Sequence, residues 1–418
     1  MEILIVAAEL SPYTKAGEAG ESIASLSRML AQLGHAVTVA LPRYASFEEQ
    51  GLLVARRLTP LRLPSGDPVT VFDGQLGSGV KLALFDAPEL FTREGVYDEN
   101  GEEYPDNARR FGLLAQAATA LAARRASEDQ PFDVAHLHDW PGALTAVLLA
   151  QAEIPLPKVL TLHDVQRTGS FAATQLDALG ITPDGFSEAG VKQGSRINVL
   201  KGGVLMADIL TTVAPAYAED LALPEQGGVL ASAIAGRKDE LMGIVNGLDY
   251  SIYNPAVDTA LASRYNAENP ANKGSSKTAV LRQLELDIDP ERPLIVAAGE
   301  LTKENGFELL LETLPRLLTQ DVTVIVGGAP SSPLAKAFGA RAYQQYGNFA
   351  FVSDLDSPAE RRLLAAGDFA LALHPYDLTG SLPRKAQRYG AAPVAYGRAA
   401  VKDTVVDADP ELETGTGF

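Results

Sequence analysis

Histidine side chains stand where several predicted parallel strands end. His138 closes the segment PFDVAHLH, His163 follows KVLTL and His374 follows FALAL, and these are three of the five histidines in the chain. Neutral imidazole can donate or accept a hydrogen bond, which suits sugar hydroxyls or a developing charge. Strand-end histidines also bond to backbone groups, so a structural role stays equally open. His136 and His138 should share one face, but no third ligand stands at metal spacing, so we expect no metal.

A glycine-containing loop runs from Lys15 to Glu21, between the first predicted strand and the first predicted helix. Backbone amides and the helix dipole at such a loop attract phosphate, and Lys15 supports that function. Glu18 and Glu21 oppose it, because a carboxylate a few ångströms from a diphosphate costs on the order of 1 kcal/mol in water. A tight turn capped by glutamate in the first helical turn is an equally good explanation.

The elements that must position these residues follow from the hydrophobic pattern. Residues 2–8 and 37–41 form apolar runs typical of buried strands, and the segment between them reads as a helix ended by Gly34. We expect the apolar face of that helix to consist of Ile23, Leu26, Leu30 and Leu33. The same strand, helix, strand order recurs in PFDVAHLH, PGALTAVLLAQ and KVLTLHD. The chain is therefore predicted to be an α/β protein with a doubly wound parallel sheet.

A second alternation of strands and helices begins after the pattern breaks around Asn246-Gly247 and Tyr253-Asn254-Pro255. Its predicted strands are PLIVAAGEL, VTVIVGG, FAFVSD, FALALHP and APVAYG, with helices over ENGFELLLETLPRLL, SPAERRLLAAG and SLPRKAQRYG. We therefore expect two Rossmann-like domains, residues 1–250 and 251–418, that face each other across a cleft. Ligands of open parallel sheets bind outside the carboxyl ends of the strands.

Composition excludes several classes of protein. A chain of 418 residues that is 46% hydrophobic and 21% charged can bury two ordinary cores, which excludes disordered and fibrous proteins. The opening MEILIVAAEL lacks the basic start of a signal peptide, and no apolar run approaches the length of a membrane span, so we predict a cytoplasmic protein. The net charge of −18 disfavours nucleic acid and anionic membranes as partners. The absence of cysteine excludes disulfides and thiolate chemistry.

Collinear motifs carry a resemblance to a known family over essentially the whole chain. They are MEILIVAAELSPYTKAGEAGESIASL, YPDNARRF, HLHDWPGAL, TLHDVQRTGSF, INVLKGG, TTVAPAYAED, GIVNGLDYSIYNP, DTV and GTGF. In these segments the chain closely resembles bacterial glycogen synthases and plant starch synthases. The resemblance implies a GT-B glycosyltransferase architecture. It also implies transfer of glucose from ADP-glucose to the non-reducing end of an α-1,4-glucan, with retention of configuration and without a metal or cofactor.

The resemblance also implies roles for individual residues. Residues 1–250 would form the acceptor side and residues 251–418 the nucleotide-sugar side. The catalytic positions would be His163, Asp139 and Asp377. Substrate contacts would come from Lys15, Gly17, His138, Trp140 and Gly380, with Lys15 on the donor or its phosphates and Gly380 in the loop whose backbone faces the nucleotide.

The chain departs from the family where the donor diphosphate should bind. Glu300 stands for an arginine and Asn305 for a lysine, and these two cations neutralise the leaving diphosphate in the family. Each unit of the changed charge is worth on the order of 3 kcal/mol at about 6 Å. Lys303 lies two residues from Asn305 and could replace the lost charge. Because it stands at the start of a predicted helix, we expect its side chain to point away from the diphosphate. Further departures are Glu18 for glycine, Glu21 for aspartate, Asp164 for asparagine, Asp377 for glutamate and Arg398 in the altered Thr-Gly-Gly-Leu segment.

Three functions remain open at this point. The first is a working glucosyltransferase in which another cation, with Arg398 as the candidate, serves the donor. The second is a catalytically inactive paralogue that binds glucan or a partner enzyme of glycogen metabolism. The third is a related enzyme with a donor that lacks phosphate. The chain also ends at Gly415-Thr416-Gly417-Phe418, where family members continue, so we expect a shortened second domain and weaker closure between domains.

Overall fold

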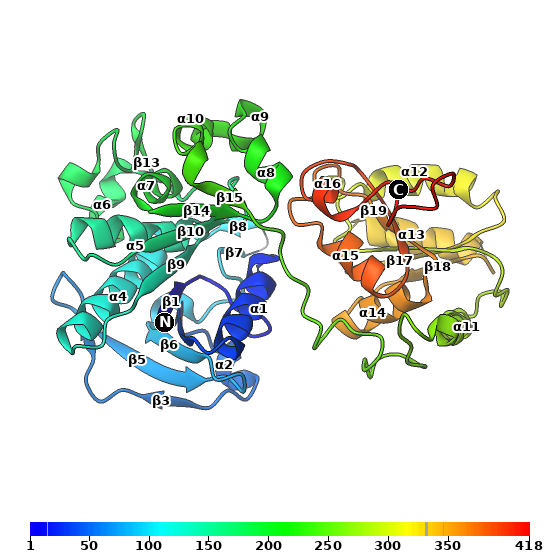
Figure 1. Cartoon of the computed structure of the whole chain (residues 1–418), viewed down its shortest axis with the longest axis horizontal. Helices are drawn as coiled ribbons and strands as arrows, with labels where there is room; N and C mark the ends of the chain where they lie inside the picture. The colour runs from blue at the N-terminus through cyan, green and yellow to red at the C-terminus, as the bar shows by residue number, and fades with distance from the viewer. Residues whose placement is uncertain (15, 100, 331–332, 346) are drawn as a thin grey trace. The chain divides into compact units, whose positions relative to one another are not determined.

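The computed structural model describes residues 1–14, 16–99, 101–330, 333–345 and 347–418. The chain divides into two compact units, Met1–Gly247 and Leu248–Phe418, called here the N-terminal and C-terminal units. Each unit is built on its own sheet with helices packed on it (Figure 1). Lys15, which the sequence places in the donor site, lies outside the described residues.

The main sheet of the N-terminal unit has the strand order β15-β14-β10-β9-β1-β2-β6-β5-β3, with β4 paired to β5. Neighbouring strands from β15 to β6 are parallel, whereas β5 and β3 are antiparallel. The strands are β1 (Glu2–Val6), β2 (Ala36–Pro42), β3 (Val54–Arg56), β4 (Leu61–Arg62), β5 (Pro68–Gln75), β6 (Lys81–Asp86), β9 (Val134–His138), β10 (Lys158–Leu162), β14 (Ile209–Thr212) and β15 (Leu241–Gly243).

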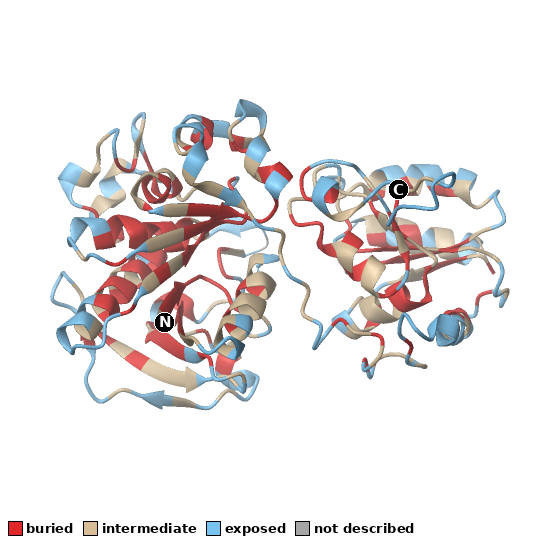
Figure 2. Cartoon of the chain, in the orientation of Figure 1, coloured by how far each residue is buried: buried red, intermediate tan, exposed pale blue. Residues whose placement is uncertain are grey.

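The winding of this sheet reverses at β1, which pairs with β2 on one side and with β9 on the other. Central strands are buried on both faces, as Figure 2 shows by their red ribbons, because helices cover both sides. In such sheets the crevice that takes a ligand opens at the carboxyl ends of the strands near the reversal. The carboxyl ends of β9 and β10 are therefore the place to look for chemistry.

Helices connect the strands of the N-terminal unit. They are α1 (Ala19–Gln32), α2 (Ser46–Glu49), α3 (Pro88–Phe91), α4 (Asn107–Ser127), α5 (Asp139–Gln151), α6 (Leu176–Leu179), α7 (Val199–Met206), α8 (Pro215–Asp220), α9 (Pro224–Gly227) and α10 (Ala231–Ala235).

The first helix departs from the sequence-based expectation at its end. Leu33 was expected on the apolar face of α1, but that expectation is wrong. The helix ends at Gln32 and Leu33 is 67% exposed, whereas Gly20, Ile23 and Ser27 are buried.

Small strands lie outside the main sheet of the N-terminal unit. They are β7 (Asp98–Glu99), paired with β8 (Glu102–Glu103), and the three-stranded set β11 (Ser170–Ala172), β13 (Arg196–Asn198) and β12 (Lys192–Gln193). The second set leads directly into α7, whose first turn is capped by the Asn198 side chain accepting from the N–H of Lys201 at 2.9 Å.

Two glycines in the INVLKGG segment allow α7 to pack closely on α5. A Cβ atom added at Gly203 would collide with Ala143, and one added at Gly202 would lie 2.9 Å from Val147. Both contacts are with α5, the helix that begins at Asp139 directly after β9. The glycines therefore help to set the position of the residues at the start of α5.

The C-terminal unit has a five-stranded parallel sheet in the order β18-β17-β16-β19-β20. Its strands are β16 (Leu294–Ala298), β17 (Thr323–Gly327), β18 (Phe349–Val352), β19 (Phe369–Ala372) and β20 (Ala392–Ala395). Its helices are α11 (Lys273–Gln283), α12 (Phe307–Leu317), α13 (Pro333–Gln344), α14 (Ser357–Ala366), α15 (Ser381–Arg388) and α16 (Val401–Thr404). Two buried clusters form its core, one containing Tyr265 and Tyr389 and the other Phe307 and Phe338.

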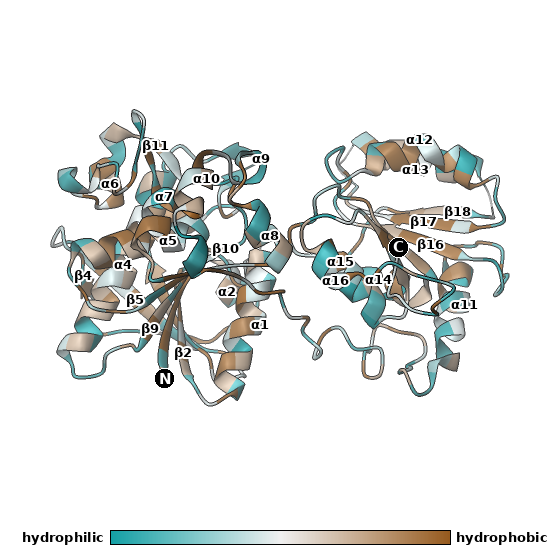
Figure 3. Cartoon of the chain, turned by 45° about the horizontal axis from the view of Figure 1, so that its top comes forward, coloured by the Kyte–Doolittle hydropathy of each residue, from teal (hydrophilic) through white to brown (hydrophobic). Residues whose placement is uncertain are grey.

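The predicted fold class is confirmed, because both units carry parallel sheets with helices between successive strands. Figure 3 shows the basis of that prediction, since the strands are mostly hydrophobic and much of the outer helical surface is hydrophilic. The antiparallel strands β3 and β5 at one edge were not predicted. No helix in the described ranges has the length and hydrophobicity to cross a membrane.

Gly203→Ala is expected to destabilise the protein by about 1–3 kcal/mol, because the added methyl group overpacks the contact between α7 and α5. Urea unfolding followed by circular dichroism measures the change. The matched control is Gly274→Ala in α11, where nothing lies within 4 Å of an added Cβ. The control should be neutral or stabilising, because alanine favours a helix over glycine. Equal losses in both variants would contradict the close packing.

Candidate functional site

Two imidazoles meet at the carboxyl ends of β9 and β10. Thr161 of β10 lies opposite His138 of β9, and His163 follows two residues later on the same face. Nδ1 of His138 and Nε2 of His163 are 2.9 Å apart, and both side chains are almost fully buried. Parallel register therefore brings together two of the three strand-end histidines that the sequence singled out.

Burial keeps these imidazoles neutral. It lowers the pKa of His163 to about 3 and the pKa of His138 well below its ordinary value, with His136 adding repulsion in both cases. Burial alone lowers the pKa of His136 to about 4. A neutral imidazole offers one donor and one acceptor, so the group is suited to hydrogen bonding with uncharged hydroxyls.

A hydroxyl network extends this cluster sideways across the sheet. His136 stacks on His138 with ring centroids 4.4 Å apart, and its Nε2 lies 2.7 Å from the Thr161 hydroxyl. The Thr161 hydroxyl in turn lies 2.7 Å from the Thr211 hydroxyl on β14. The sequence predicted that His136 and His138 share a face. The two threonines were missed, although Thr161 alternates with His163 along the strand.

Asp139 occupies the first position of α5 in an unusual backbone conformation, with φ of 52°. Its Oδ1 accepts the N–H of His163 at 2.7 Å and that of Asp164 at 3.3 Å. Burial outweighs these bonds and raises the pKa of Asp139 to about 8. Positive φ at a residue other than glycine costs energy and is concentrated at functional sites. Asp139 thus links the start of α5 to the backbone that carries His163.

The Trp140 side chain packs into an aromatic cluster and is 4% exposed. Its ring lies 4.8 Å from that of Phe111 and 5.5 Å from that of Phe171, both edge to face. Gly169 has φ of 62° and an added Cβ there would lie 2.6 Å from the Trp140 ring. The structure therefore gives Trp140 a packing role, and its contact with a glucan stays a prediction.

The glycine-containing loop is held by a carboxylate that sequence reasoning missed. Glu9 is 4% exposed, and its Oε2 accepts the N–H of Ala16 at 2.7 Å and that of Gly17 at 3.1 Å. These two amides are thus already paired inside the loop. Glu18 stands at the N-cap of α1 and Glu21 lies in its first turn, but the Glu18 side chain makes no capping hydrogen bond there, so the capped-turn explanation stays a prediction. The signal for Glu9 was a carboxylate inside the apolar opening segment.

The turn that carries Glu300 leads from β16 into α12. The Asn305 side chain donates to the Glu300 carbonyl oxygen at 3.0 Å, and the Asn305 N–H donates to the Thr302 hydroxyl at 3.1 Å. Glu300 itself is exposed. Lys303 pairs with Glu308, with Nζ 3.3 Å from its carboxylate. Asn305 therefore stabilises the turn.

Asp377 and Gly380 lie together in the loop before α15. Oδ1 of Asp377 accepts the N–H of Thr379 at 3.0 Å and that of Gly380 at 2.8 Å. Gly380 has φ of 58°, which glycine adopts without strain. His374 precedes this loop, and its Nδ1 accepts the N–H of Tyr376 at 3.0 Å. The neighbouring loop carries an exposed Arg398, and its Ala400 donates to the Asp377 carbonyl oxygen at 3.2 Å.

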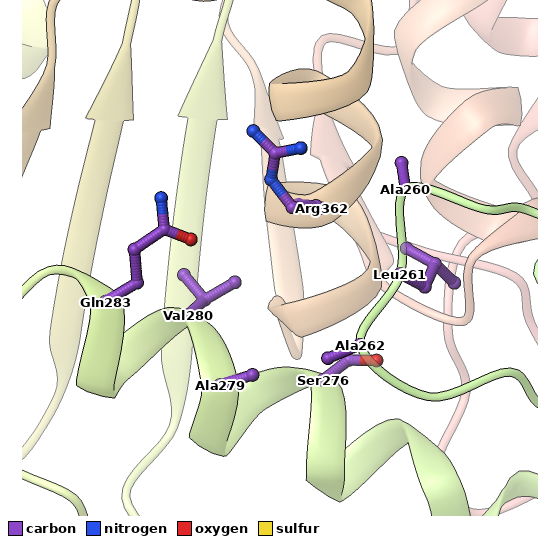
Figure 4. Close-up of a pocket in the computed structure, with 8 residues that line it drawn as sticks. All are labelled: Ala260, Leu261, Ala262, Ser276, Ala279, Val280, Gln283 and Arg362. Carbon is purple, nitrogen blue, oxygen red and sulfur yellow. The ribbon is translucent and has the colours of Figure 1, made fainter.

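A pocket of about 180 Å³ lies elsewhere in the C-terminal unit, between α11, α14 and the segment 260–262 (Figure 4). Val280 and Ala279 give it an apolar wall, and Arg362 and Gln283 line it with polar ends. Ligand pockets usually hold about 300–1,000 Å³, so this one is too small for a nucleotide sugar. It contains none of the residues singled out from the sequence. Within the described ranges, no three carboxylate or histidine side chains converge as metal ligands.

Asp139 should make stability fall as pH rises toward 8. Its pKa is about 8 in the folded state and 3.8 ordinarily, so the folded state keeps a proton that the unfolded state has lost. Stability then drops by up to about 1.4 kcal/mol per pH unit until pH 8. The buried histidines act oppositely, but only below about pH 6.5. Denaturant unfolding at pH 6.5 and 8 should show this loss in the unmodified protein and not in Asp139→Asn. Asp177→Asn, on an exposed residue, should retain the loss.

Comparisons with known proteins agree with this fold. A sequence model of the starch synthase catalytic domain matches residues 2–236. Glycogen synthase of Anaeromyxobacter sp. (strain Fw109-5) is 33% identical over 429 residues, covering 100% of this chain and 88% of the relative. Glycogen synthase of Thioalkalivibrio sulfidiphilus is 33% identical over 417 residues, covering 98% of this chain and 86% of the relative.

A solved structure is similar over nearly the same length. The catalytic domain of starch synthase IV from Arabidopsis thaliana, bound to ADP and acarbose, superimposes with a TM-score of 0.87 at 25% sequence identity. The match covers 98% of this chain and 85% of that chain. Family motifs, the parallel sheets and the full-length relatives all agree, so this chain belongs to the glycogen and starch synthase family.

Proposed function

We propose that this protein transfers glucose from ADP-glucose to the non-reducing end of an α-1,4-glucan with retention of configuration. The observation that carries the proposal is the neutral His138–His163 pair beside Asp139, at the carboxyl ends of β9 and β10. Members of the family to which the chain belongs are glycogen synthases, and the similar starch synthase IV domain is bound to ADP and acarbose. We extend a nucleotide-sugar donor and a glucan acceptor to this chain on that basis.

The proposal assigns roles to the two parts of the chain. Residues 1–250 would take the acceptor, with His138, Asp139 and Trp140 on its side. His163 would stand near the transferred sugar, where a neutral ring can hydrogen-bond a hydroxyl without placing a charge beside it. Residues 251–418 would take the nucleotide sugar.

The proposal also names residues in each part of the chain as candidate contacts with the donor. Lys15 would contact the donor or its phosphates, and Gly17 would also contact the substrate. The loop that contains Asp377 and Gly380 would contribute from the other part. Its Gly380 amide is engaged by the Asp377 carboxylate at 2.8 Å, so a donor that uses this amide must compete with that bond.

The diphosphate then needs a cation in place of the two that the family supplies. Lys303 is exposed and paired with Glu308, which leaves it poorly placed for this task. Arg398 is exposed, and its loop is bonded to the Asp377 loop through Ala400. We therefore assign Arg398 to the donor phosphates, where a fixed positive charge stabilises the leaving group. This assignment is compatible with an active enzyme that binds its donor weakly.

Glucose incorporation tests the reaction directly. The purified chain should transfer labelled glucose from ADP-glucose into glycogen. An enzyme that cleaves only α-1,4 bonds should then release the label from that glycogen. His163→Ala should lower the rate by about a hundredfold or more, as is usual when a preorganised hydrogen-bonding group at the reacting centre is removed. Binding of glycogen without any incorporation would overturn the proposal and favour an inactive, glucan-binding paralogue.

Glu300→Arg should tighten the binding of ADP by tenfold or more, because a charge change of two is worth several kcal/mol at about 6 Å from a phosphate. Titration calorimetry with ADP and with ADP-glucose measures it. The matched control is Glu304→Arg, which makes the same charge change at an exposed position of the same turn. Asn305 is left unchanged because its side chain supports the turn. Equal gains in both variants would mean that Glu300 is remote from the diphosphate.

A further inference from the structure

Two buried nitrogen atoms of the histidine pair have no hydrogen-bond partner among the described residues. They are Nε2 of His138 and Nδ1 of His163. The side chains are only 3% and 6% exposed, so bulk water does not satisfy these atoms. A buried polar atom without a partner costs about 1–3 kcal/mol, and each such atom in a native structure calls for an explanation.

The bond between the rings links the states of these outer nitrogens. A neutral imidazole carries one N–H, and Nδ1 of His138 lies 2.9 Å from Nε2 of His163, so one proton lies between the rings. If His138 donates it from Nδ1, then Nε2 of His163 accepts and its proton is on Nδ1. If His163 donates it from Nε2, then the proton of His138 must be on its own Nε2.

Both rings must therefore hold the same tautomer, either Nδ1–H on each or Nε2–H on each. Opposite tautomers would place two protons or two lone pairs face to face at 2.9 Å. In either allowed arrangement one outer nitrogen is a donor and the other an acceptor. A change at Nε2 of His138 thus reverses the hydrogen-bond polarity of Nδ1 of His163.

We propose that His138 is a positioning residue that ties the tautomer of His163 to its own, and with it whether His163 donates to or accepts from a hydroxyl group. This role rests on the proposed function for its effect on the reaction, because His163 is there placed near the transferred sugar. Nε2 of His163 is occupied by His138, so Nδ1 is the nitrogen left for a ligand.

Neighbouring groups keep the pair in this arrangement. His136 stacks on His138, and the rings of His138 and His163 are themselves 5.2 Å apart at an angle of 29°. Asp139 holds the backbone N–H of His163 at 2.7 Å, which fixes the point from which the second ring extends. Ring nitrogens of a functional histidine are commonly directed by a partner on the opposite nitrogen.

Nitrogen-15 NMR of the full chain labelled at histidine tests the coupling without any ligand. The chain has five histidines, so the ring signals can be assigned with single His→Asn variants. Both His138 and His163 should be neutral and should show the same tautomer. Opposite tautomers on the two rings, or a protonated ring at neutral pH, would overturn the proposal.

Two variants separate positioning from packing. In His138→Asn the amide stands at the place of Nδ1 and can still donate to or accept from His163. In His138→Gln the amide stands nearer the place of Nε2, so the bond to His163 is lost. Nε2 of His163 should give the signal of a hydrogen-bonded nitrogen in the Asn variant, and the tautomer of His163 should change in the Gln variant. A single, unchanged tautomer in His138→Gln would refute the role of His138.

Kinetics supply the second readout. The kcat for glucose transfer should be about ten- to a hundredfold lower in His138→Gln than in His138→Asn, with similar KM for ADP-glucose, as for other residues that orient a functional side chain. Equal kcat values in the two variants would contradict the proposal. If the unmodified chain transfers no glucose, the proposed function fails, whereas the tautomer result still decides whether His138 and His163 are coupled.

Discussion

The parallel register between β9 and β10 is the constraint on which the candidate site depends. It places Thr161 opposite His138 and so carries His163, two residues on, to within hydrogen-bond distance of that ring. A shift of one residue would turn His163 to the other face of the sheet. Helix α5 starts at Asp139, directly after β9, and so continues from the site. The glycines of α7 allow α7 to pack closely on α5.

Burial determines the chemistry available at that register. Three imidazoles in an apolar sheet end stay neutral, and a carboxyl group at the start of α5 keeps its proton to about pH 8. The result is a cluster rich in hydrogen-bonding atoms and poor in charge. Such a cluster suits recognition of a sugar better than binding of a phosphate or a metal ion.

Several loops that the family resemblance connects with the donor satisfy their own backbone amides. Glu9 accepts from Ala16 and Gly17, and Asp377 accepts from Thr379 and Gly380. Asn305 similarly supports the turn at Glu300. Short side chains that bond to nearby backbone groups make a loop rigid. The replacements at 305 and 377 are thus compatible with stable loops, and of the two only the one at 305 replaces a positive charge that the family carries.

The sequence by itself determined the two α/β units, most strand positions and the histidines at strand ends, because hydrophobic periodicity and turn residues are local signals. The collinear motifs also determined the family. Tertiary structure alone decided that Leu33 is exposed, that Glu9 holds the glycine loop and that Trp140 packs against Gly169. It likewise decided that His138 pairs with His163, since a hydrogen bond between residues 25 positions apart depends on strand order and register, which no local pattern encodes.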